Sequence, residues 1–235
     1  MATEETTLGP KGRTYGDACG AAQGLDLVGE RWTLLLVREL LLGPKRFTDL
    51  RKGLPGISTN ILADRLETLE VSGVARRHTL PPPAASKVYE LTDWGRELGP
   101  VVEAIGRWGA RSPWRSGEDE IGVDGLMVSF RTMFDPEVAG NLEASYEIVL
   151  GDQRFGLEVE DGSIRVYRGA PSDPDARIGT DVETLGALVY EGRDLDEALR
   201  SGDAEIEGDR SAVERLTGLF ALPEPAPKPA GAEGR

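Results

Sequence analysis

The chain has 235 residues, enough for two domains that each bury a core of their own. Its net charge is −14, but residues 1–115 hold 16 Lys and Arg against 14 Asp and Glu, whereas the remainder holds 11 against 27. The first half is therefore free to meet phosphates, and we expect the acidic half to face away from them.

The single cysteine excludes an internal disulfide, and residues 1–13 contain no apolar segment of a secretory signal. The longest apolar run, from Leu34 to Leu42, is interrupted by Arg38-Glu39 and falls short of the ~20 residues that a membrane span needs. We therefore expect a cytoplasmic protein without a membrane partner.

Three helices are expected next. Residues 32–42 are apolar on nearly all sides and stop at Gly43, and a second short helix is expected at residues 47–52. After a glycine turn, Ser58 is suited to cap a third helix that runs to Val71. One face of this helix carries leucines at spacings of four and three: Leu62, Leu66 and Leu69. The arrangement is typical of a helix-turn-helix, whose last helix enters the major groove.

Two strands are expected at residues 74–80 and 87–91, joined by a stiff proline loop that excludes a helix. This hairpin would form a wing, with Arg76, Arg77 and Lys87 placed to meet a phosphate backbone.

A last helix of the first half is expected from Asp93 to Arg111, capped by Thr92. Its apolar positions recur at spacings of three and four or adjoin one another: Trp94, Leu98, Val101, Val102, Ile105 and Trp108. The stripe is wide enough to bury against a partner, so we expect dimerisation through this helix and the segment around Cys19.

Several motifs of the first half keep the order and spacing of one family: Cys19, Leu25–Leu35, Gly43–Leu50, Leu54–Ser58, Leu62–Glu70 and Tyr89–Thr92. Together they resemble the HxlR family of winged-helix transcription regulators over roughly residues 15–112. The resemblance implies a homodimer on a near-palindromic operator in double-stranded DNA, with the recognition helix at Ser58–Val71 and the wing at Arg76–Lys87. Gly20 stands where the family often has proline.

The second half changes to short alternating strands. Strands are expected at 144–150, 155–159, 164–166, 177–180 and 204–207, and helices near 182–190, 195–200 and 210–220. The first three strands should form an antiparallel meander. Residues 223–235 are expected to be a flexible tail.

Short motifs of this half, among them Phe155–Val159, Thr184–Leu188 and Leu195–Leu199, resemble the sterol-carrier-protein-like fold, which is also found at the C-terminus of alkyl sulfatases. The resemblance implies an apolar tunnel that would serve as an effector site. The candidate pocket residues are Tyr146, Ile148, Phe155, Leu157, Val166, Leu185 and Leu188. The alternative for the aromatic side chains is that they fill a core.

The expected fold is α+β, a winged helix-turn-helix domain followed by a sterol-carrier-like domain with an antiparallel sheet. The expected parts are a flexible N-terminus at 1–14, a DNA-binding domain at 15–115, a ligand-binding domain at 116–222 and a disordered tail at 223–235.

Base edges should be reached from the first turns of the third helix by Ser58, Thr59, Asn60 and Ala63, and the amide of Asn60 can pair with adenine. The alternative is that Ser58 only caps the helix and that Thr59 and Asn60 are solvated surface residues. The remaining DNA contacts, mostly to phosphates, are expected from Arg46, Thr48, Arg65, Arg76, Arg77 and Lys87.

Cys19 occupies the position at which some HxlR members keep a thiol that senses electrophiles or oxidants; its alternative is a small buried side chain. With one histidine and no phosphate-loop or dinucleotide motif, the sequence predicts no enzyme, no cofactor and no metal. The interpretation is a dimeric DNA-binding regulator controlled by an apolar small molecule. The alternatives are a redox regulator acting through Cys19, and a lipid carrier or enzyme whose winged domain is a vestigial dimerisation module.

Overall fold

The computed structural model describes residues 14–115 and 119–228 of the chain, so the expected flexible N-terminus lies almost wholly outside the described residues. The chain divides into two compact units between Val102 and Glu103, within helix α6 (Gly99–Ala110). The expected domain boundary at residue 115 lies later in the chain, after α6. Within the part described, no helix is both long and apolar enough to cross a lipid bilayer.

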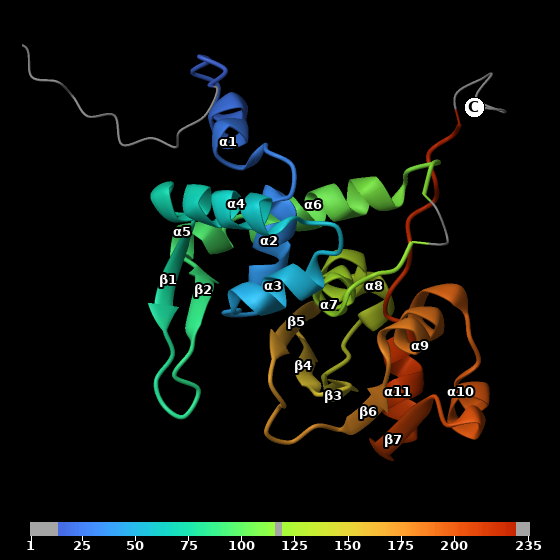
Figure 1. Ribbon diagram of the computed structural model, residues 1–235. Coiled ribbons are helices and arrows are strands. Elements are labelled where there is room, and N and C mark those ends of the chain that lie inside the picture. Colours follow the sequence, from blue (N-terminus) through green and yellow to red (C-terminus); the bar gives the residue numbers. More distant parts are fainter. Residues whose placement is uncertain (1–13, 116–118, 229–235) are drawn as a thin grey trace, which may run out of the picture. The chain divides into compact units, whose positions relative to one another are not determined.

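The first unit contains the three expected helices (Figure 1). Its helices before the wing are α1 (Gly20–Val28), α2 (Thr33–Leu40), α3 (Phe47–Gly53) and α4 (Thr59–Val71). The prediction for α4 is confirmed, since Ser58 caps it and its three leucines are no more than 1% exposed. They pack with Leu36 and Leu50 into the core of this unit.

The expected wing is confirmed as an antiparallel hairpin of β1 (Ala75–Thr79) and β2 (Lys87–Leu91). Figure 1 shows its loop projecting away from α4. The hairpin gains a third partner that the sequence did not indicate. The backbone N–H of Lys45 donates to the carbonyl of Tyr89 at 2.9 Å, and that of Tyr89 donates to the carbonyl of Lys45 at 2.8 Å.

The single helix expected after Thr92 is wrong, because the chain forms two helices, α5 (Asp93–Arg96) and α6. Thr92 does cap α5, and its Oγ1 accepts a hydrogen bond from the N–H of Gly95 at 3.0 Å. The break falls before Pro100, whose ring carries no N–H to continue the hydrogen-bond ladder of α5.

The second unit is built on a five-stranded sheet in the order β5-β4-β3-β6-β7. Its strands are β3 (Ala144–Leu150), β4 (Gln153–Glu160), β5 (Ser163–Arg168), β6 (Ala176–Thr180) and β7 (Ala204–Gly208). The antiparallel meander β3-β4-β5 is confirmed, but the sheet is mixed, because β6 pairs parallel to β3. The loop before β6 explains this: Asp175 bonds Ser145 through both its N–H and its carboxylate, so β6 starts beside the start of β3.

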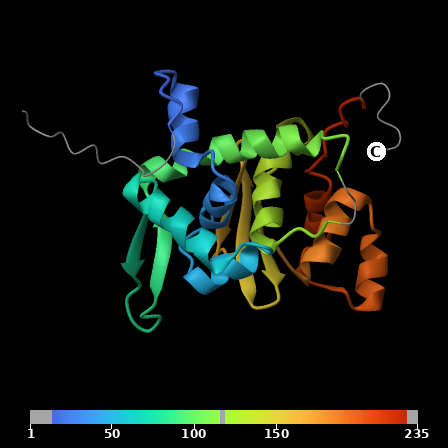
Figure 2. The same ribbon diagram turned by 45° about the horizontal axis from the view of Figure 1, so that its top comes forward.

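Helices of the second unit pack on this sheet. They are α7 (Val123–Met133), α8 (Pro136–Ala139), α9 (Val182–Gly186), the π-helix η1 (Ala187–Glu191), α10 (Leu195–Ser201) and α11 (Arg210–Thr217). The helices after Asp181 were expected, whereas α7 and α8 were not. Figure 2 shows α7 beside strands β3 to β5, and its Leu126, Met127 and Phe130 are fully buried.

The C-terminal part of α6 belongs to the second unit and packs on α7. Glu103 pairs with Arg131 at 2.6 Å, and Arg107 donates to the carbonyl of Thr132. The expected tail lies outside the described residues from 229 onward. Its earlier part contacts the chain after α6, where the N–H of Ala226 donates to the carbonyl of Arg111 at 2.7 Å.

Candidate nucleic-acid interface

The side chains in the first turn of α4 are exposed, while the helix itself is held in place by its cap and by the core of the first unit. Ser58 has extended backbone angles, and its Oγ accepts a hydrogen bond from the N–H of Ile61 at 3.3 Å. Thr59, Asn60 and Ala63 are exposed on the side opposite the buried leucines. The core therefore holds α4 by one face while its N-terminal side chains point into solvent, and Ser58 both caps the helix and remains exposed.

Two further candidates lie at the start of α3. Arg46 is the N-cap residue of α3 and is exposed, as is Thr48 in the first turn. Arg65 differs from them, because its guanidinium pairs with Glu30 at 3.4 Å and only 24% of its side chain is exposed. A phosphate at Arg65 would therefore have to compete with a carboxylate.

The two arginines of the wing lie on opposite faces of the hairpin. Arg76 and Arg77 are neighbours in β1, so their side chains leave opposite faces of the hairpin. Arg77 lies 3.8 Å from Glu70 of α4 and is 56% exposed. Lys87, at the start of β2, is exposed. These two side chains keep the freedom that a phosphate contact needs.

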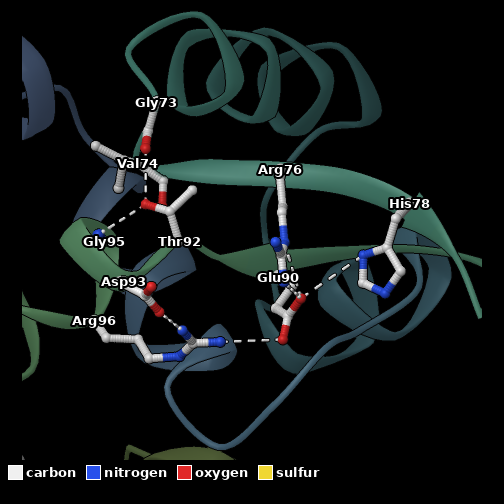
Figure 3. A network of polar contacts seen from close by, with 9 residues as sticks. All are labelled: Gly73, Val74, Arg76, His78, Glu90, Thr92, Asp93, Gly95 and Arg96. Carbon is white, nitrogen blue, oxygen red and sulfur yellow. Dashed lines mark hydrogen bonds and ion pairs between the residues drawn. The ribbon is translucent and has the colours of Figure 1, made fainter.

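Arg76 is held in a network around Glu90, which stands directly opposite it in β2 (Figure 3). Its Nε and Nη2 donate to Oε2 of Glu90 at 3.1 and 2.8 Å, while Arg96 of α5 donates to Oε1 at 3.1 Å. Nδ1 of His78 lies 3.8 Å from the same carboxylate. The hydrogen bond from Arg76 lowers the pKa of Glu90, although burial opposes the shift.

This network connects both wing strands to α5. Next to it, the hydroxyl of Thr92 donates to the carbonyl of Gly73 at 2.8 Å and so joins the start of α5 to the turn before β1. A Cβ at Gly95 would overlap the carbonyl oxygen of Val74, so only glycine fits where α5 crosses the wing (Figure 3). Glu90 and Arg96 were not among the expected site residues, since a contact across two strands and a helix leaves no local signal.

A buried ion pair was also missed. Glu39 of α2 is 1% exposed, and its Oε2 accepts a hydrogen bond from Nζ of Lys45 at 2.7 Å. In the sequence, Glu39 stands out only as an interruption of an apolar run. A charged residue inside such a run, followed by a lysine after the helix, is the signal that was available.

Cys19 is exposed, so the alternative of a small buried side chain is wrong. It is the N-cap residue of α1, and its backbone N–H donates to Oδ1 of Asp17 at 2.9 Å.

The seven candidate pocket residues come together in the interior of the second unit. None is more than 6% exposed. Tyr146, Leu157 and Val166 are direct neighbours across β3, β4 and β5, and Ile148 stands opposite Phe155. Leu185 and Leu188 come from α9 and η1. All seven side chains are therefore buried within the second unit.

Comparison with known proteins also divides the chain in two, but after α6 and not within it. Residues 27–116 match the family described as HxlR-like helix-turn-helix, and residues 123–226 match the family described as alkyl sulfatase C-terminal.

Individual relatives cover only part of the chain. It is 36% identical over 86 residues to the HTH-type transcriptional regulator YvaP of Bacillus subtilis, which is 37% of this chain and 80% of that protein. The HTH-type transcriptional regulator YodB of the same organism is 37% identical over 35% of this chain and 73% of its own length. A Synechocystis regulator, sll1512, is 37% identical over 44% of this chain and 75% of its own.

Proposed function

Because the chain belongs to the HxlR-like helix-turn-helix family of transcriptional regulators, we propose that it binds a specific operator as a homodimer. In this proposal α4 enters the major groove and the wing lies along the phosphate backbone. The second unit adds control by an apolar small molecule.

The first turn of α4 carries this proposal. Its side chains at positions 59, 60 and 63 are exposed and short, which lets the helix approach base edges closely. The amide of Asn60 both donates and accepts, as the major-groove edge of adenine requires. The buried leucines behind it hold the helix without using these side chains.

Phosphate contacts are assigned to Arg46, Thr48, Arg77 and Lys87, which surround this turn in the chain and are exposed. Arg65 and Arg76 are weaker candidates, since the Arg65 side chain is only 24% exposed and Arg76 donates two hydrogen bonds to Glu90. Arg77 also has a carboxylate partner, Glu70, but at the longer distance of 3.8 Å and with 56% of its side chain exposed. The charge distribution supports the same assignment, because the excess of carboxylates lies after residue 115.

Base readout and phosphate contact are separated by two variants. The probes are a duplex that the wild-type protein selects from a random library and a random duplex of equal length. Asn60→Ala should weaken the selected duplex by about 1–3 kcal/mol and the random one little, whereas Arg77→Ala should weaken both about equally. Glu67→Ala, an exposed change later in α4, is the matched control. Equal losses on both probes for Asn60→Ala would remove it from base readout.

A homodimer is supported by α6. Val101, Ile105 and Trp108 recur at helical spacing and are 43%, 48% and 80% exposed. Large apolar side chains in such a row favour burial against a second copy of the same helix.

Effector control is supported by the match of residues 123–226 to the alkyl sulfatase C-terminal family and by the apolar interior next to α9 and η1. A ligand regulates only if it binds the DNA-competent and DNA-incompetent forms unequally, and a coupling of ~1–3 kcal/mol would shift operator affinity roughly 5- to 150-fold. Lipophiles that raise the unfolding temperature should therefore be titrated against the selected duplex. A saturating ligand that leaves DNA affinity unchanged would make this unit a carrier or scaffold.

The exposure of Cys19 favours a second regulatory signal, oxidation of its thiol. In that case oxidant should change the affinity of the wild-type protein for the selected duplex and leave Cys19→Ser unaffected. An equal response of both proteins would exclude the thiol as the sensor.

A further inference from the structure

The buried carboxylate of Glu39 occupies an unfavourable position. It lies near the C-terminal end of α2, where the helix dipole disfavours a negative charge, and it is removed from water. Two cations compensate for this: Lys45 donates to Oε2 at 2.7 Å and Arg38 donates to Oε1 at 2.8 Å. Both oxygens are thus held in defined directions, and Lys45 is itself only 8% exposed.

The main chain of Lys45 is bound to the wing. It exchanges two backbone hydrogen bonds with Tyr89 of β2, at 2.9 and 2.8 Å. Tyr89 in turn packs partly buried against the core of the first unit. One residue therefore has its side chain fixed by α2 and its main chain fixed by β2.

The end of α3 packs closely against the same carboxylate. A Cβ at Gly53, the last residue of α3, would stand 2.9 Å from Cδ of Glu39 and would overlap Oε2. Glycine is therefore required at this position while Glu39 keeps its place. Three elements, α2, α3 and the wing, converge on one ion pair.

We propose that the Glu39–Lys45 pair is a positioning device for DNA binding, which fixes the wing relative to α3 and α4. The inference rests on the proposed function. The pair lies between two groups of phosphate contacts, since Arg46 follows Lys45 directly and Lys87 belongs to the strand that Lys45 pairs with. Without the pair the wing still forms, but its contacts and those of α4 no longer fit one duplex together.

Specific binding should suffer more than random binding, because a random duplex is held by charge alone and tolerates a displaced wing. Lys45→Met keeps an unbranched side chain and leaves Glu39 with a single cation. We expect the preference for the selected duplex over the random duplex to fall about tenfold or more. Leu36→Ala, a buried change in α2, is the matched control: it lowers stability and keeps the preference.

Positioning is separated from stability by the double variant Glu39→Leu/Lys45→Met. Removing both charges leaves no buried carboxylate short of a cation, so the unfolding temperature should recover relative to Lys45→Met. The preference for the selected duplex should stay low, because the directional contact is gone. Recovery of the preference together with the unfolding temperature would overturn the proposal and make the pair a structural contact only.

Gly53→Ala tests the same contact with every charge in place, since the added Cβ must displace the carboxylate. It should lower the preference as Lys45→Met does, whereas Gly186→Ala, where an added Cβ meets nothing, should not. An unchanged preference in Gly53→Ala would contradict the proposal.

A measurement on the protein without DNA tests this inference independently of the proposed function. The amide of Tyr89, bonded to Lys45, should exchange its hydrogen about tenfold faster in Lys45→Met, while the amide of Leu62 in α4 should not change. A wild-type protein that selects no duplex would refute the proposed function alone. Unchanged exchange at Tyr89 would refute the pair as the anchor of the wing.

Discussion

Substitutions of Ser58 distinguish the stability of α4 from its contact with DNA. The Oγ of Ser58 satisfies the N–H of Ile61 at 3.3 Å, a long and solvent-accessible hydrogen bond. Loss of an N-cap costs about 0.5–2 kcal/mol, and this geometry places Ser58→Ala in the lower half, at about 0.5–1 kcal/mol. For a unit of this size that lowers the unfolding temperature by roughly 2–8 °C, which scanning calorimetry of the full chain resolves.

Ser58→Asp restores the cap, because aspartate accepts the same hydrogen bond, and it also favours the N-terminus of a helix. The unfolding temperature should then match that of the wild-type protein. For a phosphate taken to lie about 7 Å from the new carboxylate in the proposed complex, however, the repulsion is about 0.6–2.4 kcal/mol at effective dielectric constants of roughly 80 to 20. Operator affinity should fall roughly 3- to 60-fold at low salt. A stable Ser58→Asp protein with unchanged affinity would refute the placement of this turn on DNA.

Three further outcomes are expected. Ile105→Asp should be a folded monomer by light scattering, because Ile105 is 48% exposed within one chain; a stable dimer would place the interface elsewhere. The hydrogen bond from Arg76 lowers the pKa of Glu90 below its ordinary 4.5, so ionised Glu90 stabilises the wing above that pH and its contribution is lost on acidification. Glu90→Gln should therefore lose less stability than the wild-type protein from about pH 5 to pH 3, and parallel losses would contradict this. Burial raises the pKa of Tyr190 to about 12, so the phenol that Tyr190→Phe removes from an ultraviolet titration should be one that ionises late; loss of a phenol that ionises near the ordinary pKa of about 10 would disprove its burial.

The features that the sequence predicted are those with a local physical cause. The leucine spacing of α4 and its serine cap belong to one short stretch of chain, and the proline loop between β1 and β2 restricts the backbone directly. The same holds for the strands of the meander, whose alternation follows from a sheet buried on one face.

The features that the sequence did not predict depend on partners far along the chain. α7 is buried on nearly every side because it packs against β5 and α9, which come later in the chain. β6 runs parallel to β3 because Asp175 is tied to Ser145. The roles of Glu39 and Glu90 likewise appear only when α2, α3, α5 and the wing are brought together.

The proposed function requires α4 and the wing together to bind one DNA sequence in preference to others. The most direct measurement is the affinity of the wild-type protein for the selected duplex and for a random duplex of equal length, as a function of salt. We expect both affinities to fall steeply with salt and the selected duplex to stay ~10³-fold or more tighter throughout. Equal affinities for the two duplexes at every salt concentration would contradict it.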